Sequence, residues 1–508
     1  MINSHVIIEE DIEEKFMKII MFGLPASGKG TQSQLLTEYL HIPQLSTGDL
    51  LRSLKETDTT AIGDEVRAIP VGEFASDELI LRAIKEELNK EKYKNGVIFD
   101  GFPRTKNQAE KMIEWGIIPD AVVFLNANEN DLIERAVNRR VHVASGRIYN
   151  VKDNPPLVEG KDDITGEALT HRDDDQPEII IKRFEDFKNK TMPAYKHLES
   201  LCLYGEGPVL VKINAERNKK QVFRDLLVGI KSAKSIHKIR DKHEFVLLIS
   251  PFSDSQNEEI KRKQLAYSRL AMHDSLMNGE IPFSPQNFYS QGNIINNFHE
   301  SGKTTLLSLS KQLLSQFHKI VFYKDDSLFD KNTEKDVYCG TILQYAQSVG
   351  IPVEIRKLNY FENNYSEHIG VAVDKILPTI TDVIDFNEQS SRVIIESPYA
   401  GTAEEIKRNE DYARNAVYDC LKKGEIPFAS HILYTQPGVL DDTQSAQRRL
   451  GIEAGLIMGT ICQKTVLYQD LGMTPGMEEG IQRAKKSGRK VEIRNIFEID
   501  ISPKKQKI

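Results

Sequence analysis

A glycine-rich segment near the N-terminus constrains the fold of this chain most strongly. The sequence GLPASGKGT, residues 23 to 31, follows an apolar run, Met17 to Phe22, that predicts a strand, and it precedes a pattern with helical periodicity. In a loop of this kind, glycines let main-chain N–H groups converge on a phosphate chain, and the helix N-terminus adds a positive dipole. The lysine can reach the β and γ phosphates, and the threonine hydroxyl can meet magnesium. The segment therefore predicts a strand, loop and helix of an α/β fold that binds nucleoside phosphates.

Length, composition and charge bound the class of protein. The 508 residues suffice for about three domains of ordinary size, and a content of 40% hydrophobic and 28% charged residues is typical of globular proteins. The net charge of −8 predicts no broad basic surface for nucleic acid or anionic membrane. Four widely spaced cysteines form no C-x-x-C pair, which predicts neither a zinc site nor a disulfide framework and favours a reducing cytoplasm.

The chain shows no targeting or membrane signal. Residues 1–15 are acidic and lack the basic start and apolar core of a signal peptide, so we expect a loose N-terminal extension. No apolar run approaches the roughly 18 to 20 residues needed to cross a bilayer, and we expect no membrane-embedded segment. Lys504, Lys505 and Lys507 predict a solvated C-terminal tail.

Two further polar clusters follow predicted strands. The sequence LSTGDLLR spans residues 45 to 52, and VIFDGFPRT spans residues 97 to 105 with Gln108 one helical turn beyond. In an open parallel sheet, ligands bind outside the carboxyl ends of the strands. We therefore expect both clusters to face one cleft together with the glycine-rich loop.

These segments resemble adenylate kinase in its long bacterial form over most of residues 16–230. The resemblance rests on GLPASGKGTQ, STGDLLR, DGFPRT, RRVHVASGRIYNVKDNPPLVEGKDDITGE and HRDDDQPE, in the family's order and approximate spacing. It implies a kinase domain over residues 16–232, with a lid at about 139–175, that converts ATP and AMP into two ADP. One departure is Ala26, where the family's loop commonly has a further glycine. A methyl group there asks for a φ angle below zero.

The resemblance also implies roles for individual residues. ATP would be bound by Gly23, Ala26, Ser27, Gly28, Lys29, Gly30, Thr31, Arg135, Arg139 and Tyr149. AMP would be bound by Thr47, Arg52, Gly101, Arg104, Gln108, Arg172 and Arg183. Catalysis would rest on Lys29, Arg104, Arg139, Arg172 and Arg183, with Mg²⁺ held by Asp100 through water. Clustered guanidinium groups suit this chemistry, because phosphoryl transfer depends on positioning and charge neutralisation.

The segment between Arg139 and Arg172 is too long for a simple connection, which favours a lid. The family's lid is held either by a four-cysteine zinc site or by a hydrogen-bonded quartet. This segment has no cysteine, and the quartet positions are His142, Ser145, Asp162 and Thr165, so we expect no zinc. Two alternatives stay open for this domain: a kinase for another monophosphate such as UMP or CMP, which the long lid disfavours, and a nucleotide sensor without catalysis.

The second half of the chain contains a duplication. The sequence SPF at 250 is followed by SPY at 397, an offset of 147 residues, and GEIPF occurs at 279 and at 424, an offset of 145. The run Lys319–Asp325 corresponds to Lys464–Asp470, and VEIR occurs at 353 and at 491. Each copy alternates strands and helices, which predicts two small parallel sheets of flavodoxin or Rossmann type. We expect one copy over residues 244–360, a linker over 361–391 with a helix around Val371–Leu377, and a second copy over 392–508.

The second copy carries the candidate ligand residues of this half. The sequence SPYAG, residues 397 to 401, follows its first predicted strand, and DLGMTPGM, residues 470 to 477, follows its third. These motifs resemble the nucleoside 2-deoxyribosyltransferase superfamily, which implies binding of a nucleoside or nucleotide and action on its N-glycosidic bond. The family's nucleophilic glutamate would fall at Gly480, where this chain has none, and Ile342 is in register in the first copy. A shift of register would restore a carboxylate from a neighbouring position, although one residue turns a helical side chain by about 100°. The candidate residues are Tyr399, Asp470, Thr474, Gly476, Glu478 and Glu479.

The remaining motifs have simpler interpretations. SGKT at 301 to 304 lacks the earlier glycine of a phosphate loop and aligns with a predicted helix in the second copy, so we expect a helix there. Arg448 and Arg449 are either phosphate contacts or part of a solvated helix face. The first copy lacks the Thr-Pro-Gly-Met loop and is expected to be a structural or regulatory partner. The alternative for both copies is a non-catalytic nucleotide sensor or an assembly module, which also offers a route to oligomers.

Overall fold

The computed structural model describes residues 17–57, 59–69, 75–171, 175–202, 207–251, 258–289, 291, 294–295, 300–325, 328, 337–358, 380 and 383–496. The chain forms two compact units, one ending at residue 233 and including residues 444–446, and the other containing the rest. The predicted N-terminal extension, the predicted helix at 371–377 and the lysine tail lie outside the described residues. None of the described helices is both long enough and apolar enough to cross a membrane.

The first unit is built on a five-stranded parallel sheet in the order β2-β3-β1-β4-β7. Its strands are β1 (Met17–Gly23), β2 (Gln44–Ser46), β3 (Gly96–Asp100), β4 (Ala121–Asn126) and β7 (Val209–Asn214). In the central strand, Ile19 lies beside Ile98 of β3 and Ala121 of β4. These three residues are completely buried, as the near-continuous apolar sequence of a central parallel strand requires.

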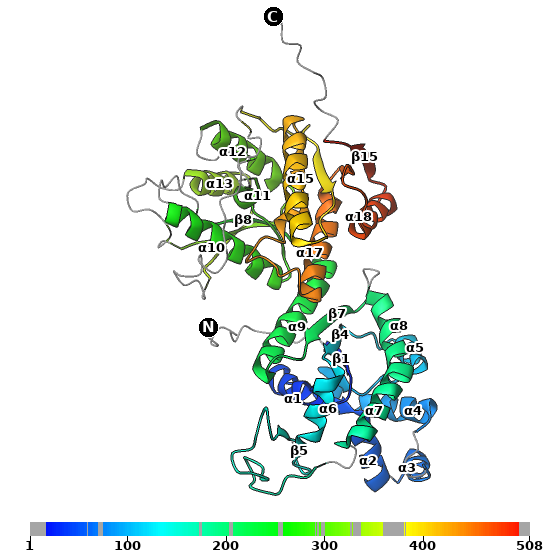
Figure 1. The fold of residues 1–508 in the computed structure, drawn as a ribbon. Coiled ribbons are helices and arrows are strands. Elements are labelled where there is room, and N and C mark those ends of the chain that lie inside the picture. The colour runs from blue at the N-terminus through cyan, green and yellow to red at the C-terminus, as the bar shows by residue number, and fades with distance from the viewer. Residues whose placement is uncertain are drawn as a thin grey trace, which may run out of the picture. The chain divides into compact units, whose positions relative to one another are not determined.

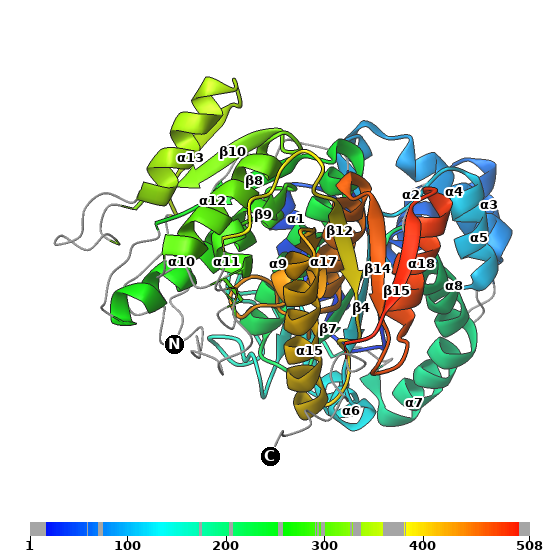
Figure 2. The same cartoon turned by 90° about the horizontal axis from the view of Figure 1, so that it is seen from above.

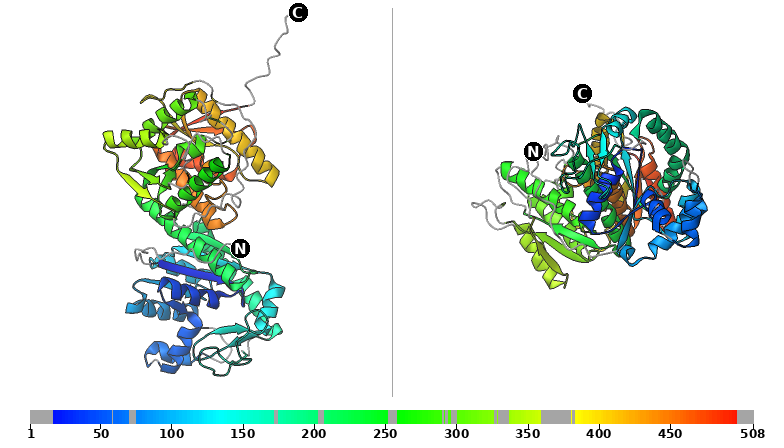
Figure 3. Two further views of the ribbon diagram at one scale, coloured as in Figure 1. Left: turned by 90° about the vertical axis from the view of Figure 1, so that its left-hand side faces the viewer. Right: turned by 90° about the horizontal axis from the view of Figure 1, so that it is seen from below.

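Helices lie on both faces of this sheet (Figures 1 and 3). They are α1 (Lys29–Leu40), α2 (Thr47–Thr57), α3 (Ala61–Arg67), α4 (Asp77–Leu88), α5 (Lys106–Glu114), α6 (Glu129–Val137), α7 (Pro177–Asp186), α8 (Met192–Cys202) and α9 (Lys219–Lys242). A core cluster joins Ile84 of α4, Met112 of α5 and Leu198 of α8 to Ile20 and Phe99 of the sheet. This packing holds the carboxyl ends of β1 and β3 at one edge, where the glycine-rich loop begins.

The second unit contains two four-stranded parallel sheets with one topology. The first has the order β11-β10-β8-β9 and the second β13-β12-β14-β15, so in both sheets the four strands lie in the spatial order 2-1-3-4. The strands are β8 (Phe245–Ile249), β9 (Ile281–Phe283), β10 (Lys319–Tyr323), β11 (Val353–Arg356), β12 (Arg392–Glu396), β13 (Ile426–Phe428), β14 (Lys464–Tyr468) and β15 (Lys490–Arg494). Figure 2 shows β12, β14 and β15 side by side. The chain is therefore an α/β protein in which a unit with a five-stranded parallel sheet precedes two smaller parallel-sheet repeats.

The helices of the two sheets also correspond. The first sheet carries α10 (Glu258–Met277), α11 (Pro285–Tyr289), α12 (Glu300–Leu314) and α13 (Val337–Ser348); the second carries α15 (Ala403–Lys422), α16 (Ser430–Leu433), α17 (Ser445–Met458) and α18 (Pro475–Lys486). The SGKT segment at 301–304 lies in α12, which confirms the predicted helix. In the two corresponding runs Lys319–Asp325 and Lys464–Asp470, the strands end two residues before the aspartate, at Tyr323 and Tyr468. We call the two sheets with their helices the first and the second repeat.

The duplication extends to a network of charged side chains. In the first repeat, Arg356 binds Glu280 through two hydrogen bonds of 2.7 and 2.9 Å, and Lys319 lies 2.8 Å from the same carboxylate. In the second repeat, Arg494 binds Glu425 at 2.7 and 2.8 Å, and Lys464 also pairs with Glu425. Repetition in both copies indicates that this network serves the fold rather than a ligand. Phe283 and Phe428, equivalent residues of the two repeats, meet with ring centroids 4.8 Å apart.

Candidate active site

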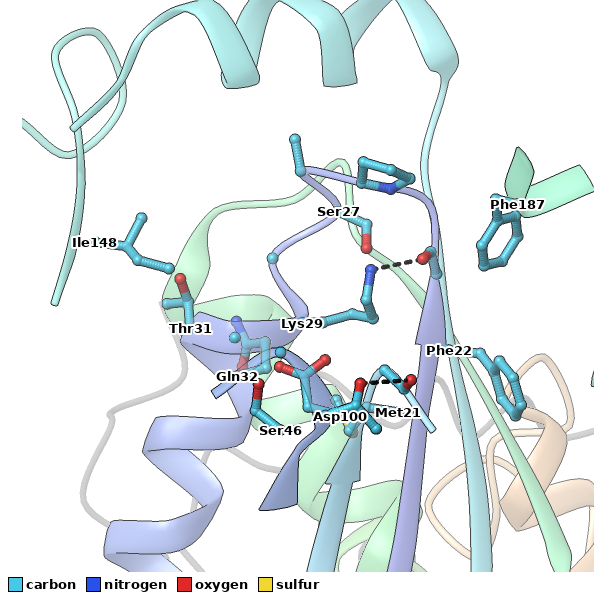
Figure 4. A pocket seen from close by; sticks show the side chains of 18 of the residues that line it. Met21, Phe22, Ser27, Lys29, Thr31, Gln32, Ser46, Asp100, Ile148 and Phe187 are labelled. Carbon is cyan, nitrogen blue, oxygen red and sulfur yellow. Dashed lines mark hydrogen bonds between the residues drawn. The ribbon is translucent and has the colours of Figure 1, made fainter. Parts of the chain in front are cut away.

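A cleft of about 1260 Å³ lies at the carboxyl ends of β1 and β3 in the first unit. It is lined by the glycine-rich loop, by both polar clusters that the sequence singled out, and by part of the lid. The expectation of one shared cleft is confirmed for these segments. Figure 4 shows Ser27, Lys29, Thr31 and Asp100 around this space, with Ile148 of the lid beside Thr31.

The glycine-rich loop is built as a phosphate cradle. Gly28, the N-cap of α1, has φ +93°, a left-handed conformation that favours glycine. The Lys29 ammonium donates hydrogen bonds of 2.6 and 3.0 Å to the carbonyls of Gly23 and Leu24. The Ser27 hydroxyl is buried and has no hydrogen-bond partner within the described part of the chain. A phosphate in the cradle would offer acceptors to both groups.

The environment of Lys29 is strongly electropositive. Burial is the main cause that lowers the pKa of Lys29 to about 8; Asp100 raises it, whereas Arg104, Arg183 and Arg139 lower it further. Three arginines therefore act on one lysine across the cleft. Such a concentration of positive charge suits a ligand with several phosphates.

Ala26 adopts a conformation that its side chain disfavours. Its φ angle is +63°, in the left-handed region, whereas the sequence led us to expect a negative value for a residue with a methyl group. The loop backbone is held on both sides, by the Ser27 N–H bond to the Leu24 carbonyl and by the start of α1. The geometry of the loop therefore overrides the local preference of alanine.

The residues predicted to bind the acceptor nucleotide AMP lie close together after β2 and β3. Thr47 and Arg104 both donate to the carbonyl of Gly101, at 3.0 and 2.9 Å. The Gln108 side chain, only 1% exposed, accepts from the Arg104 N–H at 2.7 Å and donates to Asp77 at 2.7 Å. Arg52 lies on the cleft wall, largely exposed and paired with Asp49.

Asp77 was missed by the sequence analysis. Its carboxylate accepts from Gln108 and also from the Thr105 hydroxyl at 2.7 Å, so it joins α4 to the loop before α5. The available signal was weak, because Asp77 follows Ser76, the N-cap of α4, and looks like an ordinary first-turn acid.

Of the predicted arginines Arg135, Arg139, Arg172 and Arg183, the structure describes three. Arg139 binds Asp175 with two hydrogen bonds, and the aspartate is fully buried. Arg135 donates to the Ala215 carbonyl at 2.7 Å, and Arg183 lines the cleft. Arg172 lies outside the described residues. Asp175, in the acidic run that follows Arg172, is a further residue that the sequence analysis missed.

The cleft contains oxygen donors suited to a hard divalent cation. Asp100 lies beside the loop, its carboxylate 3.9 Å from where a Cβ on Gly30 would sit, and Thr31 lines the same space. Burial raises the pKa of Asp100, while Lys29 and Arg104 oppose this shift. Within the described residues no group of three or more His, Cys, Asp or Glu could hold a metal by itself. A carboxylate, a hydroxyl and substrate phosphates fit Mg²⁺, which keeps much of its water.

The four predicted lid residues lie together. His142 Nδ1 is 2.7 Å from the Ser145 hydroxyl, Thr165 donates to Asp162 at 3.0 Å, and the Thr165 hydroxyl is 3.3 Å from His142 Nε2. The lid also contains the antiparallel ribbon of β5 (Arg139–Val141) and β6 (Ile148–Asn150).

Asp162 has more partners in the lid than the quartet predicts. Arg147 donates to it twice, at 2.8 and 2.6 Å, and the Tyr149 hydroxyl donates at 2.9 Å. The hydrogen bond from Arg147 is the main cause that holds the pKa of Asp162 well below its usual range. Tyr149, expected to contact ATP, therefore uses its hydroxyl inside the lid.

Comparison with known families separates the two halves of the chain. Residues 21–201 match the adenylate kinase family model. The match indicates nucleoside monophosphate kinase phosphoryl transfer for this part of the chain, and it covers the loop, the lid and most of the residues that line the cleft. Residues 391–494 match a family model described as a domain of unknown function (DUF7768), which spans β12 to β15 and assigns no activity.

Several candidate residues of the second repeat serve its fold. Thr474 is the N-cap of α18 and accepts from the Met477 N–H at 3.4 Å. Asp470 accepts from the Tyr412 hydroxyl and from the Ile496 N–H at 2.9 Å. Tyr399 lies beside His431, with ring centroids 6.1 Å apart.

The glutamates expected near position 480 differ in their surroundings. Glu479 lies 3.4 Å from Arg449 on α17, whereas Glu478 is exposed in the first turn of α18. The carboxyl group that lies against Gly480 belongs to a different residue, Glu396 at the end of β12. The sequence analysis missed Glu396, because its position in a strand predicts only a half-buried residue.

Proposed function

We propose that residues 16–232 transfer the terminal phosphoryl group of ATP to AMP and form two ADP. The observation that carries this proposal is the convergence of Lys29, Arg104, Arg139 and Arg183 on one cleft that has a phosphate loop at one end. The polar group of Thr47, Arg104 and Gln108 lines the same cleft and would bind the acceptor nucleotide. The adenylate kinase family match supports the same reading.

In this proposal the protein positions two nucleotides and neutralises their charge. Lys29 would exchange its bonds to the Gly23 and Leu24 carbonyls for phosphate oxygens of ATP, and Thr31 and Asp100 would hold the cation, Asp100 through water. Mg²⁺, when bound, supplies further positive charge to the transferring phosphates. Arg104 and Arg52 would hold the acceptor phosphate, and Arg139, Arg183 and Arg172 would surround the phosphoryl group in flight. Preorganised charges of this kind stabilise the charge of the transition state more strongly in a site that excludes water than they would in water.

The lid would exclude water during transfer. In this proposal the lid moves as a unit, because the bonds between Arg147, Tyr149 and Asp162 hold it together internally. Ile148 contributes an apolar contact at the loop, 3.5 Å from where a Cβ on Gly30 would lie. Excluding water favours the acceptor phosphate over hydrolysis.

A coupled assay of ADP formation tests the proposal. Lys29→Met removes one preorganised charge and is expected to lower kcat by about 10²-fold or more. Lys111→Met is the matched control, because Lys111 pairs with Glu114 on α5 and lies outside the cleft. Unchanged turnover in the Lys29 variant would contradict the kinase assignment. The same assay with AMP, UMP, CMP and GMP decides between AMP and another acceptor.

We also propose that the second repeat binds a nucleoside or nucleotide and acts on its N-glycosidic bond, while the first repeat is its structural partner. Support comes from a difference between two copies of one fold: β12 ends in a carboxyl group beside α18, whereas the equivalent strand of the first repeat ends in Ile249. The test is chromatography of free base after incubation of the full chain with nucleosides and nucleotides. Binding without base release would favour the non-catalytic sensor instead.

A further inference from the structure

Two partners of opposite kind hold the carboxamide of Gln108 in one orientation. Its nitrogen, Nε2, donates to Asp77 Oδ1 at 2.7 Å, and its oxygen, Oε1, accepts from the Arg104 N–H at 2.7 Å. A carboxylate only accepts hydrogen bonds, and a main-chain N–H only donates them. Turning the amide over would place its oxygen against the carboxylate and its nitrogen against the N–H. The two partners therefore determine on which side the nitrogen of Gln108 lies.

The Asp77 carboxylate is itself fixed in position. Its second oxygen, Oδ2, accepts from the Thr105 hydroxyl at 2.7 Å and from Asn107 Nδ2 at 3.1 Å. Thr105 is the N-cap of α5, and its hydroxyl also accepts from the Gln108 N–H at 3.1 Å. Asp77 is the first residue of α4. The carboxylate thus joins the first turns of two helices, and Gln108 cannot turn without breaking this connection.

The fixed carboxamide keeps one donor and one acceptor for a ligand. An amide NH₂ group has two N–H bonds and an amide oxygen has two lone pairs, and within the described residues one of each is used. Gln108 is only 1% exposed and borders the cleft, as Asp77 does. A ligand in the cleft therefore meets a donor and an acceptor whose order cannot be exchanged.

Nucleobases fall into two classes by the order of the same two groups. Adenine and cytosine carry an amino group next to a ring nitrogen that accepts, whereas guanine and uracil carry a carbonyl oxygen next to a ring N–H. A carboxamide that is free to turn can match either order. One that is fixed matches a single order and meets the other with donor against donor. Polar groups left mispaired in a buried site reject an analogue strongly.

We propose that Asp77 is a positioning residue that sets acceptor selectivity: by fixing the amide of Gln108, it favours monophosphates of adenine and cytosine over those of guanine and uracil. The proposal rests on the proposed kinase function of the first unit and adds the residue that makes Gln108 read in one direction. Asp77 acts through Gln108 and not on the transferring phosphoryl group. Stabilisation of the helix start does not explain its contacts, because Glu78 supplies an acidic side chain in the same first turn.

Steady-state kinetics of the full chain with AMP, CMP, UMP and GMP at saturating ATP test the proposal. Asp77→Asn replaces a group that only accepts by one that also donates, and Asp77→Ala removes the partner of Gln108. In both variants kcat/KM for AMP should fall about tenfold, mainly through a higher KM. The ratio of kcat/KM for AMP to that for UMP should fall about tenfold as well, because the amide can now turn. The KM for ATP should stay unchanged.

Two control variants separate selectivity from stability. Glu78→Gln removes the same charge from the same turn of α4, and Asn107→Ala removes one donor to Asp77 while it leaves the bond to Gln108. Neither side chain lines the cleft, and both variants should keep the KM for AMP and the acceptor ratio. A purely structural role of Asp77 would lower the Tm and leave that ratio unchanged.

The outcomes distinguish this proposal from the function on which it rests. An acceptor ratio that is unchanged in the folded Asp77 variants would overturn the role of Asp77 and leave the kinase function standing. The same holds for an unmodified chain that prefers UMP or GMP as acceptor. If Asp77→Ala does not fold, Asp77→Asn decides, because it keeps the shape of the side chain. Absence of turnover by the unmodified chain with all four acceptors would overturn the kinase function and the role of Asp77 with it.

Discussion

Tyr289 and Tyr434 form reciprocal hydrogen bonds between the two repeats. The Tyr289 hydroxyl donates to the Pro427 carbonyl at 2.8 Å, and the Tyr434 hydroxyl donates to the Pro282 carbonyl at 3.1 Å. The two donors are equivalent in sequence, as are the two acceptors, so the repeats pack as an isologous pair within one chain. A single chain has in this way built the interface that two identical subunits would form.

Removing either hydroxyl should destabilise the second unit. All four groups are buried, so Tyr289→Phe or Tyr434→Phe leaves a carbonyl without its donor, at about 1 to 2 kcal/mol each. Urea denaturation followed by circular dichroism measures the change. Tyr418→Phe is the control, since within the described residues no hydrogen bond is made by its hydroxyl. Equal stability of all three variants would show that the reciprocal bonds contribute nothing.

Ala26→Gly should stabilise the kinase unit. Alanine pays a steric cost at φ +63° that glycine avoids, and the larger entropy of unfolded glycine offsets part of the gain, which leaves about 0.5 to 1 kcal/mol. The expected result is a higher Tm of the unliganded protein in differential scanning calorimetry. Ala68→Gly, at φ −74°, should instead lower the Tm slightly. A lower Tm for Ala26→Gly would contradict the strain argument.

Asp162→Asn should loosen the lid without unfolding the rest. The change replaces an acceptor of two Arg147 bonds and of the Tyr149 hydroxyl by a group that carries its own donors. We expect faster hydrogen exchange over residues 142–167, slower transfer to AMP and more hydrolysis of ATP. Glu159→Gln, an exposed lid position, should leave all three unchanged.

The same carboxylate predicts how the lid responds to acid. Because its pKa is lower in the folded lid than in the unfolded chain, its contribution to stability is complete above the unfolded value of about 4 and is lost only as the pH falls further. Exchange protection of the lid should therefore persist at pH 5 in the unmodified protein. Loss of exchange protection near pH 5 in both the unmodified protein and the control variant Glu159→Gln would argue against a salt-bridged Asp162.

Lys29 should react with amine reagents at unusually low pH. Its pKa of about 8 lies below the unfolded value of about 10.5, so the free amine forms earlier in the folded protein. The unfolded chain holds more protons between these two values, and the contribution of this group to stability therefore rises with pH across that range. Mass spectrometry of acetylated peptides should show labelling of Lys29 with a midpoint near pH 8, and ATP should protect it.

His431→Gln should be tolerated, because the first repeat carries a glutamine, Gln286, at the equivalent position. The His431 Nε2 atom lies 2.7 Å from the Ser397 hydroxyl, and in the first repeat Gln286 donates to Ser250 at 2.9 Å. Burial lowers the pKa of His431 to about 4, so the unfolded chain takes up a proton first as the pH falls below about 6.5, which destabilises the fold. The Tm of the unmodified protein should fall more between pH 6.5 and 4.5 than that of His431→Gln. His431→Leu, which leaves the Ser397 hydroxyl unpaired, should lower the Tm at every pH.

Local patterns were sufficient for much of the first unit. The strand before residue 23, the loop, and the polar clusters after β2 and β3 were predicted because each depends on short-range periodicity and on glycine at fixed positions. The duplication was equally visible, since repeated motifs at nearly constant offsets produced two sheets with one strand order. The lid quartet could be named because the segment resembles a family whose lid carries its hydrogen-bonded residues at these four positions.

Tertiary structure decided what depends on distant neighbours. The left-handed Ala26 follows from a loop held at both ends, which overrides the preference of the residue itself. Asp77 and Asp175 acquired their roles by meeting Gln108 and Arg139 from other elements. Glu396 shows the difference best: along the chain it is the last residue of a strand, 84 positions from Gly480. Only the packing of α18 on the sheet brings Gly480 to Glu396, and because glycine has no side chain, the carboxyl group fits there. Space inside a protein is shared by residues that sequence order does not connect.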